Sequence, residues 1–137
     1  MTGLAVARSV PAVAENIGPL RHAVAELADR AGASPRIAGD VALAVGEACG
    51  NVVLHAYPPG ETGPLILEAR VVDREIEVTV SDIGRGMVPQ PESAGLGLGL
   101  PLMTTLSRHL AITDGDGGRG TAVRMVFALD EDPGRGV

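Results

Sequence analysis

The segment VGEACGNVVLHAY, residues 45–57, carries polar side chains at four-residue intervals in an otherwise apolar sequence. At 100° per residue on a helix, Glu47 and Asn51 fall with Asp40 within about 40° of one another, at the edge of the apolar sector. Burying a carboxylate or an amide is costly unless a charge, a metal or a ligand satisfies it. The stripe therefore indicates either a chemical site or a half-exposed helix whose polar edge faces water. His55, alone at the helix end, is more typical of a cap or packing residue and is left out of the site.

A second carboxylate ends the alternating segment EIEVTVSD, residues 75–82. The period of two places Asp82 on the strand face that also carries the isoleucine and valines. A carboxylate in a core-facing row needs a hydrogen-bond donor, and the exocyclic amino group of a purine is a suitable one. An Asx turn with Gly84 is the structural alternative, and the strand alone does not decide between them.

A third segment, GLGLGLPLM at residues 95–103, has alternating glycines that lead into a predicted helix. Helix N-termini bind phosphates well, because their backbone N–H groups are unpaired and the helix dipole favours anions. Pro101 suits a first helical turn. The glycine spacing is not that of the dinucleotide fingerprint, and taken alone the run is equally compatible with a hinge.

The elements that must position these segments follow from hydrophobic periodicity and turn signals. We expect a strand at 4–10, a helix at about 12–31, and a second helix from Pro35 to about His55 with Ser34 as its N-cap. Two strands at 64–73 and 74–82 should follow, joined at Asp73 and Arg74. The last expected elements are a helix at about 100–109 and a hairpin of 110–113 with 121–129. This order predicts an α/β (α+β) two-layer sandwich, in which an antiparallel or mixed, mainly antiparallel sheet is covered by helices on one face. We expect one domain over residues 1–129 and a frayed acidic tail over 130–137.

Composition narrows the functional classes. The net charge of −6 and the 1% aromatic content provide neither a basic surface for a nucleic-acid backbone nor platforms for stacking bases. Cys49 is the single cysteine, which excludes an internal disulfide and a cysteine-based zinc cluster and favours the cytoplasm. No apolar run approaches the roughly 18 residues of a membrane span, and the start lacks the pattern of a signal peptide. We therefore expect no direct contact with nucleic acid or membrane.

All eleven basic residues are arginine, and the chain contains no lysine. A Walker A loop, the third strand of a eukaryotic-type protein kinase and Schiff-base chemistry each require a lysine. Any nucleotide chemistry must therefore use another architecture.

In this order and spacing, the three segments resemble the Bergerat-fold ATP-binding family of gyrase-type ATPases, sensor histidine kinases and bacterial anti-sigma factor serine kinases. Glu47 and Asn51 match the E-x-x-x-N box, Asp82, Gly84 and Gly86 match D-x-G-x-G, Gly95, Gly97 and Gly99 match G-x-G-x-G, and Thr121 in GRGT matches a fourth element. The segments EACGNVVLHAYP and GLGLPLM look most like the stand-alone anti-sigma factor serine kinases. We expect no phosphoacceptor helix pair of the histidine-kinase type.

The resemblance implies an ATP-dependent serine/threonine protein kinase that sequesters a sigma factor and phosphorylates a small STAS-type anti-anti-sigma protein. Glu47 would orient or deprotonate the attacking hydroxyl, and Asn51 would hold Mg²⁺ against the phosphates. Asp82, supported by Thr121, would accept a hydrogen bond from the adenine amino group. The implied contacts to ATP are Asn51, Asp82, Gly84, Gly86, Gly95, Leu96, Gly97, Leu98, Gly99, Leu100 and Thr121, with ATP and Mg²⁺ as cofactors. Formation of a homodimer is left open.

The ATP lid departs from the family pattern, because only MVPQPESA, residues 87–94, separates the second and third motifs. Fully extended, this stretch spans at most about 28 Å, so it has little length left to fold over a triphosphate. It also lacks the basic residue that related lids often carry, and Arg85 and Arg108 are the nearest substitutes in the sequence. A catalytically weak or inactive ATP-binding module that regulates a partner by binding alone is the alternative function.

Overall fold

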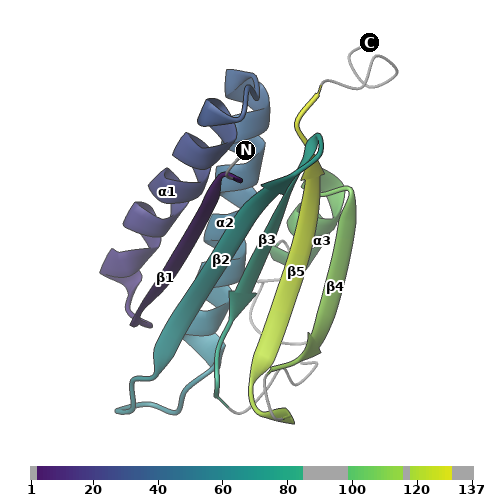
Figure 1. Cartoon of the computed structure of the whole chain (residues 1–137). Helices are drawn as coiled ribbons and strands as arrows, with labels where there is room; N and C mark the ends of the chain where they lie inside the picture. The colour runs from purple at the N-terminus through teal and green to yellow at the C-terminus, as the bar shows by residue number, and fades with distance from the viewer. Residues whose placement is uncertain (1–2, 85–98, 116–117, 131–137) are drawn as a thin grey trace.

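A computed structural model describes residues 3–84, 99–115 and 118–130 of the chain (Figure 1). The strands are β1 (Ala5–Pro11), β2 (Pro64–Val72), β3 (Glu75–Ser81), β4 (His109–Asp114) and β5 (Thr121–Ala128). The helices are α1 (Ile17–Arg30), which follows a 3-10 turn at Ala14–Asn16, then α2 (Pro35–His55) and α3 (Gly99–Leu106). Figure 1 shows the helices on one side of the sheet, so the predicted two-layer α/β architecture is confirmed.

The strands form one sheet in the order β1-β2-β3-β5-β4, and every pair of neighbours is antiparallel. Of the two predicted sheet types, the fully antiparallel one is therefore observed in the described residues. Val72 pairs with Glu75, which leaves a two-residue turn at Asp73 and Arg74 as predicted. Asp73 has a φ of 56°, a left-handed conformation that Asp tolerates better than most residues.

The core lies between the sheet and the helices. Alternation along the three central strands directs one aliphatic row of each strand at the helical layer. The buried sheet residues of this row are Leu65, Leu67, Ala69, Ile76, Val78, Val80, Val123, Met125 and Phe127. α1 adds Leu20, Val24, Leu27 and Ala28 to this core. The opposite face of the sheet carries mainly polar and charged side chains and has no helix over it (Figure 1).

α2 is the helix on which the site depends, and it packs against α1, α3 and the sheet. Its start is fixed as predicted, because the Ser34 side chain accepts a hydrogen bond from the Ile37 amide at 3.2 Å and Pro35 occupies the first helical position. By length and mean hydropathy (1.5) it also meets the criteria for a membrane span, but eight of its apolar residues are buried in the core, whereas Leu43 and Leu54 are exposed. Burial raises the pKa of the Cys49 thiol to about 12, so this cysteine behaves as a core residue.

The first helix begins later than predicted, at Ile17 rather than about Ala12. The Ala12 amide donates to the Gly63 carbonyl at 3.0 Å, so the ladder between β1 and β2 continues through this residue. The Asn16 side chain donates to the Pro11 carbonyl at 2.8 Å and closes the connection. A pairing partner far away in the sequence thus overrides the local helical pattern.

The third helix ends at Leu106 rather than about His109, because His109 already begins β4. At the C-terminal end, the Leu129 amide donates to the Arg74 carbonyl at 2.9 Å, and the Arg74 guanidinium pairs with Asp130. The rest of the predicted tail lies outside the described residues. The division into a domain and a tail stays a prediction.

Candidate functional site

Asp82 lies directly after β3 and continues its buried row, as the alternation predicts. Only 5% of the residue is exposed. Its backbone amide donates to the Thr121 carbonyl at 3.0 Å, which extends the pairing of β3 with β5 by one residue. The sheet therefore fixes the backbone of Asp82 at the point where the hydrophobic row ends.

Backbone amides of two residues act on the carboxylate of Asp82. The Gly84 amide donates to Oδ1 at 2.9 Å, and the Thr121 amide also favours the charged form. Burial raises the pKa of this carboxyl above its ordinary value, while the two amides act in the opposite direction. The Asx-type contact with Gly84 is thus present. It uses only part of the acceptor capacity of the carboxylate, which has about four lone-pair positions.

Two glycines let three chain segments meet around Asp82. A β carbon on Gly84 would lie 2.0 Å from the carbonyl oxygen of Ala56, directly after α2. A β carbon on Gly120, whose φ is +73°, would lie 2.0 Å from the carbonyl oxygen of Asp82. The end of α2, the end of β3 and the start of β5 therefore touch through their backbones. Any side chain at either glycine would separate them.

Thr121 is the first residue of β5 and is 7% exposed. Its carbonyl accepts from the Asp82 backbone amide, and it pairs with Asp114 of β4 on its other side. The sequence motif that links Thr121 with Asp82 thus corresponds to direct adjacency in the fold.

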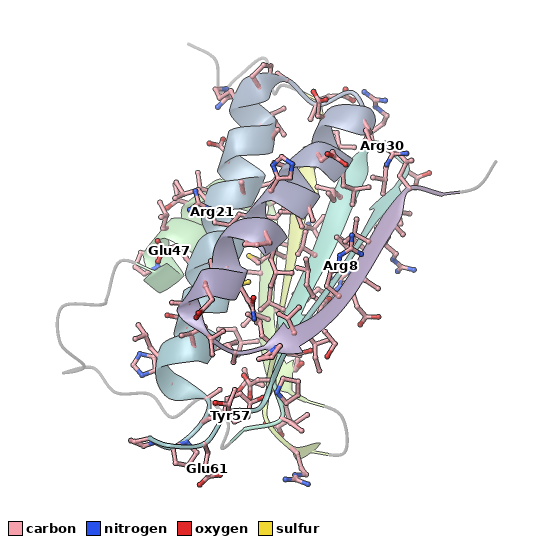
Figure 2. The ribbon with its side chains drawn as sticks, turned by 90° about the vertical axis from the view of Figure 1, so that its left-hand side faces the viewer. Arg8, Arg21, Arg30, Glu47, Tyr57 and Glu61 are labelled. Carbon is pink, nitrogen blue, oxygen red and sulfur yellow. The ribbon has the colours of Figure 1, made fainter. Side chains whose placement is uncertain are left out.

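Glu47 and Asn51 are half-buried and lie one helical turn apart on α2. Figure 2 shows Glu47 on the side of α2 where α3 lies, and α3 packs against α2. Asp40, the third polar residue of the predicted stripe, pairs with Arg36 at 3.7 Å near the start of α2. His55 is exposed in the last turn. The stripe therefore divides into an ion pair at one end of α2 and the Glu47 and Asn51 pair in its second half.

Several predicted phosphate and lid residues fall outside the described residues. These are Gly86, Gly95, Leu96, Gly97 and Leu98, together with Arg85 and the stretch 87–94. Gly99 and Leu100 are the first residues of α3, so the glycine run leads into a helix as predicted.

Arg108, one of the two arginines considered for the terminal phosphate, is paired elsewhere. Its guanidinium lies 3.5 Å from the Glu75 carboxylate at the start of β3. Asp82 follows seven residues later, about 23 Å further along the strand direction. Arg108 therefore lies at the Glu75 end of β3 and is paired there, and its contact with the terminal phosphate stays a prediction.

Tyr57 is a residue of this region that the sequence analysis did not single out (Figure 2). Its hydroxyl donates to the Pro64 carbonyl at 2.5 Å and accepts from the Ile83 amide at 3.1 Å. The sequence predicts only that a helix ends nearby, at about His55. The residue type was the one signal in the sequence that could have indicated Tyr57. The single tyrosine of the chain combines an apolar ring with a hydroxyl that needs hydrogen-bond partners when it is buried.

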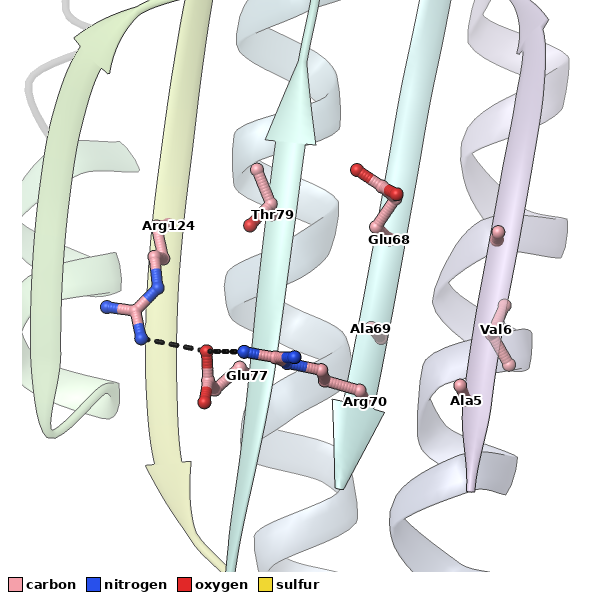
Figure 3. A pocket seen from close by; sticks show the side chains of 9 residues that line it. Ala5, Val6, Glu68, Ala69, Arg70, Glu77, Thr79 and Arg124 are labelled. Carbon is pink, nitrogen blue, oxygen red and sulfur yellow. Dashed lines mark hydrogen bonds and ion pairs between the residues drawn. The ribbon is translucent and has the colours of Figure 1, made fainter. Parts of the chain in front are cut away.

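A hollow of about 530 Å³ lies elsewhere, on the open face of the sheet (Figure 3). Arg124 and Arg70 both contact Oε1 of Glu77, at 2.8 and 3.5 Å. The Arg124 hydrogen bond, assisted by Arg70, lowers the pKa of this carboxyl against the effect of burial. The lining contains no predicted site residue, and three of its charged residues, Arg70, Arg124 and Glu77, pair with one another. We therefore assign the functional site to the region of Asp82 and α2, on the helical side of the sheet.

Comparison with known proteins identifies the family. The family model for the histidine kinase-like ATPase domain matches residues 10–127. The serine-protein kinase RsbW of Halalkalibacterium halodurans is 31% identical, over 90% of this chain and 83% of the relative. RsbW of Bacillus licheniformis is 31% identical, over 74% of this chain and 73% of the relative. An anti-sigma F factor of Clostridium botulinum is 30% identical, over 63% of this chain and 67% of the relative.

A solved structure of the RsbU and RsbW domains of Rv1364c from Mycobacterium tuberculosis has the same fold. The TM-score is 0.73 at 21% sequence identity, and the match covers 93% of this chain. The match covers 33% of the Mycobacterium chain, so the present chain corresponds to about one third of that protein. At this identity the similarity confirms the fold alone.

Proposed function

Because the chain belongs to the histidine kinase-like ATPase domain family and is similar to RsbW serine-protein kinases and anti-sigma F factors, we propose that it is an ATP-dependent serine/threonine protein kinase. It acts in the cytoplasm as an anti-sigma factor, which sequesters a sigma factor and phosphorylates a STAS-type anti-anti-sigma partner. One observation carries the proposal. The buried Asp82 carboxylate is held against Thr121 and the end of the helix that bears Glu47 and Asn51.

The base of ATP binds at Asp82 in this proposal. The carboxylate is held by the Gly84 amide and retains capacity to accept from the adenine amino group. Guanine presents a carbonyl oxygen at the same ring position, which would face the carboxylate without a proton between them. The site should therefore prefer adenine nucleotides.

The order of residues along α2 supports a defined direction for the nucleotide. Ala56 contacts the turn of Asp82, and Asn51 and Glu47 lie five and nine residues before it. At 1.5 Å per residue these positions are about 7.5 and 13.5 Å further along the helix axis. A nucleotide with its base at Asp82 would run its phosphates along α2 towards Glu47. The N-terminus of α3, packed against α2, would supply backbone amides for the phosphates.

The donor chemistry at Asn51 fits a Mg²⁺ ion that arrives with the nucleotide. Across residues 3–84, 99–115 and 118–130, no three His, Cys, Asp or Glu side chains gather into a metal-binding group. Mg²⁺ bound with ATP needs only one or two protein oxygens, since phosphates and water complete its shell. The amide oxygen of Asn51 would be that ligand. When bound, the ion neutralises phosphate charge during transfer.

Glu47 is the proposed catalytic base. Its carboxylate accepts the proton of the partner's serine or threonine hydroxyl while the hydroxyl oxygen attacks the γ-phosphorus. The bond from the γ-phosphorus to the bridging oxygen breaks, and ADP leaves. Removing the carboxylate should therefore reduce transfer far more than it reduces ATP binding.

A second candidate function is regulation by binding alone. It is favoured by the eight residues available for the lid and by the pairing of Arg108 with Glu75. In this case the chain binds ATP and a partner without transferring phosphate.

One experiment separates the two functions. The tagged protein is used to capture partners from a lysate with and without ATP, and the captured proteins are analysed for new phosphosites. The parent is then compared with Glu47→Ala and with the control Glu68→Ala, whose side chain is exposed on the open face of the sheet. A partner phosphorylated by the parent and the control but not by Glu47→Ala supports the kinase. ATP-dependent capture without any phosphosite supports regulation by binding.

A further inference from the structure

Tyr57 follows α2 by two residues, and its hydroxyl joins three parts of the chain. The hydroxyl donates to the carbonyl of Pro64, the first residue of β2, at 2.5 Å. It accepts at 3.1 Å from the amide of Ile83, the residue between Asp82 and Gly84. One oxygen atom thus connects the end of α2, the start of β2 and the turn that carries Asp82.

The ring of Tyr57 is held in place by its surroundings. A β carbon on Gly63 would lie 2.2 Å from Cε1 of the ring, so the ring lies directly against the Gly63 backbone. Burial raises the pKa of the hydroxyl, the Ile83 amide opposes this, and the negative charge of Asp82 adds to the increase. The hydroxyl therefore reaches the residue directly after Asp82.

Close backbone contacts with Ala56 and Gly120 hold the turn after β3, and side chains hold its two amides. Ile83 is 42% exposed, so burial of its side chain contributes little to fixing the turn. The two successive amides of the turn are used by side chains, Ile83 by the Tyr57 hydroxyl and Gly84 by the Asp82 carboxylate. Loss of the first hydrogen bond would allow the second to shift, and the carboxylate would shift with it.

We propose that Tyr57 is a positioning residue for adenine recognition, whose hydroxyl fixes the turn at Ile83 and thereby aims the Asp82 carboxylate at the amino group of the base. This inference rests on the proposed binding of adenine nucleotides at Asp82. Tyr57 itself touches neither the base nor the phosphates in this arrangement. Its effect is therefore on the preference for an amino group rather than on phosphate binding.

The test uses Tyr57→Phe, which keeps the ring against Gly63 and removes only the hydroxyl. Calorimetry compares ATP with purine riboside triphosphate, which lacks the 6-amino group, for the parent, Tyr57→Phe and Ser34→Ala. Ser34→Ala is the matched control, because it removes a hydrogen bond at the opposite end of α2. We expect the parent to prefer ATP by about tenfold, the range of one good hydrogen bond, and Tyr57→Phe to lose most of this preference. Ser34→Ala should lower the melting temperature but keep the preference of the parent.

The outcomes distinguish this inference from the proposed function. A parent that binds both nucleotides equally refutes recognition of adenine by Asp82 and removes the basis of the inference. If the parent prefers ATP and Tyr57→Phe prefers it to the same degree, the role of Tyr57 is overturned, but recognition of adenine by Asp82 is not. A loss of preference in Ser34→Ala as large as in Tyr57→Phe also overturns it, since any destabilisation would then suffice.

A second measurement keeps the sequence unchanged in case Tyr57→Phe does not fold. Because the chain has one tyrosine, 3-fluorotyrosine labels Tyr57 alone, and its ¹⁹F resonance reports on the hydroxyl. We expect saturating ATP to shift this resonance clearly more than saturating purine riboside triphosphate does. Equal shifts would mean that Tyr57 does not sense the amino group, which would overturn the inference.

Discussion

Gly84 lies so close to Ala56 that a β carbon would come within 2.0 Å of the Ala56 carbonyl oxygen. Backbone cannot yield as a flexible side chain does, so Gly84→Ala must push the turn of Asp82 away from α2. We expect a loss of about 1–3 kcal/mol in unfolding free energy, the range for overpacked sites, and weaker ATP binding. Thermal or urea unfolding measures the first effect and calorimetry the second.

The matched control is a glycine-to-alanine substitution at a position where the β carbon has free space. A β carbon on Gly39, near the start of α2, would meet nothing within 4 Å. Gly39→Ala should therefore stabilise the protein by about 0.5–1 kcal/mol, because alanine costs less entropy in a helix. Equal effects of the two substitutions would contradict the close packing of the Asp82 turn on α2.

The raised pKa of Asp82 predicts opposite pH dependences for stability and for ATP binding. The folded chain takes up this proton at a higher pH than the unfolded chain, so the contribution of Asp82 to stability improves as the pH falls through the folded pKa. ATP binding instead weakens over the same window, because an amino donor favours the carboxylate form.

This pH dependence is measured by calorimetry from neutral pH to about pH 4, near the ordinary pKa of an aspartate, with Asp82→Asn as the reference. The variant is titrated with the same nucleotide, so protonation of the phosphates affects both proteins equally. Its effect cancels when the two affinity profiles are compared. The parent should lose affinity more steeply than Asp82→Asn as the pH falls. Parallel profiles would mean that the Asp82 carboxylate does not contact the base.

Glu47→Ala tests the chemical step. We expect ATP affinity within a few fold of the parent and phosphoryl transfer lower by about 100-fold or more, because a positioned base acts mainly in the transition state. Asn51→Ala should instead remove the Mg²⁺ dependence of binding. Single-turnover transfer to the partner provides the rate, and an unchanged rate in Glu47→Ala would require another base.

The short stretch of residues 87–94 predicts that a partner completes the site around the terminal phosphate. Nucleotide turnover by the isolated protein should be slow, and ATP should tighten partner binding by the same factor by which the partner tightens ATP binding. Calorimetry of the partner against the ADP complex and against the complex with a non-hydrolysable ATP analogue measures this factor. Identical affinities would exclude closure assisted by the partner.

The parts of the fold that are encoded locally were predictable. Alternation placed Asp82 on the buried face of β3, Ser34 and Pro35 fixed the start of α2, and the turn at Asp73 joined two strands of matching pattern. Each of these depends on side chains only a few residues apart, whose preferences agree with the tertiary structure.

The parts that depend on distant partners were not predictable. The first helix begins at Ile17 because Ala12 pairs with Gly63, about fifty positions along the chain. The role of Tyr57 requires the carbonyl of Pro64 and the amide of Ile83, which no local pattern brings together. The sequence motifs named Asp82 and Thr121 as a pair through family resemblance, whereas their physical link is a backbone pairing between β3 and β5.

The affinity of the unmodified protein for ATP and for GTP, measured by calorimetry with Mg²⁺, tests the central claim most directly. If the buried Asp82 carboxylate accepts from the adenine amino group, ATP should bind at least about tenfold more tightly than GTP, and Asp82→Asn should weaken ATP binding by about 1–3 kcal/mol. Equal affinities for the two nucleotides in the unmodified protein would contradict the assignment of Asp82 as the adenine acceptor.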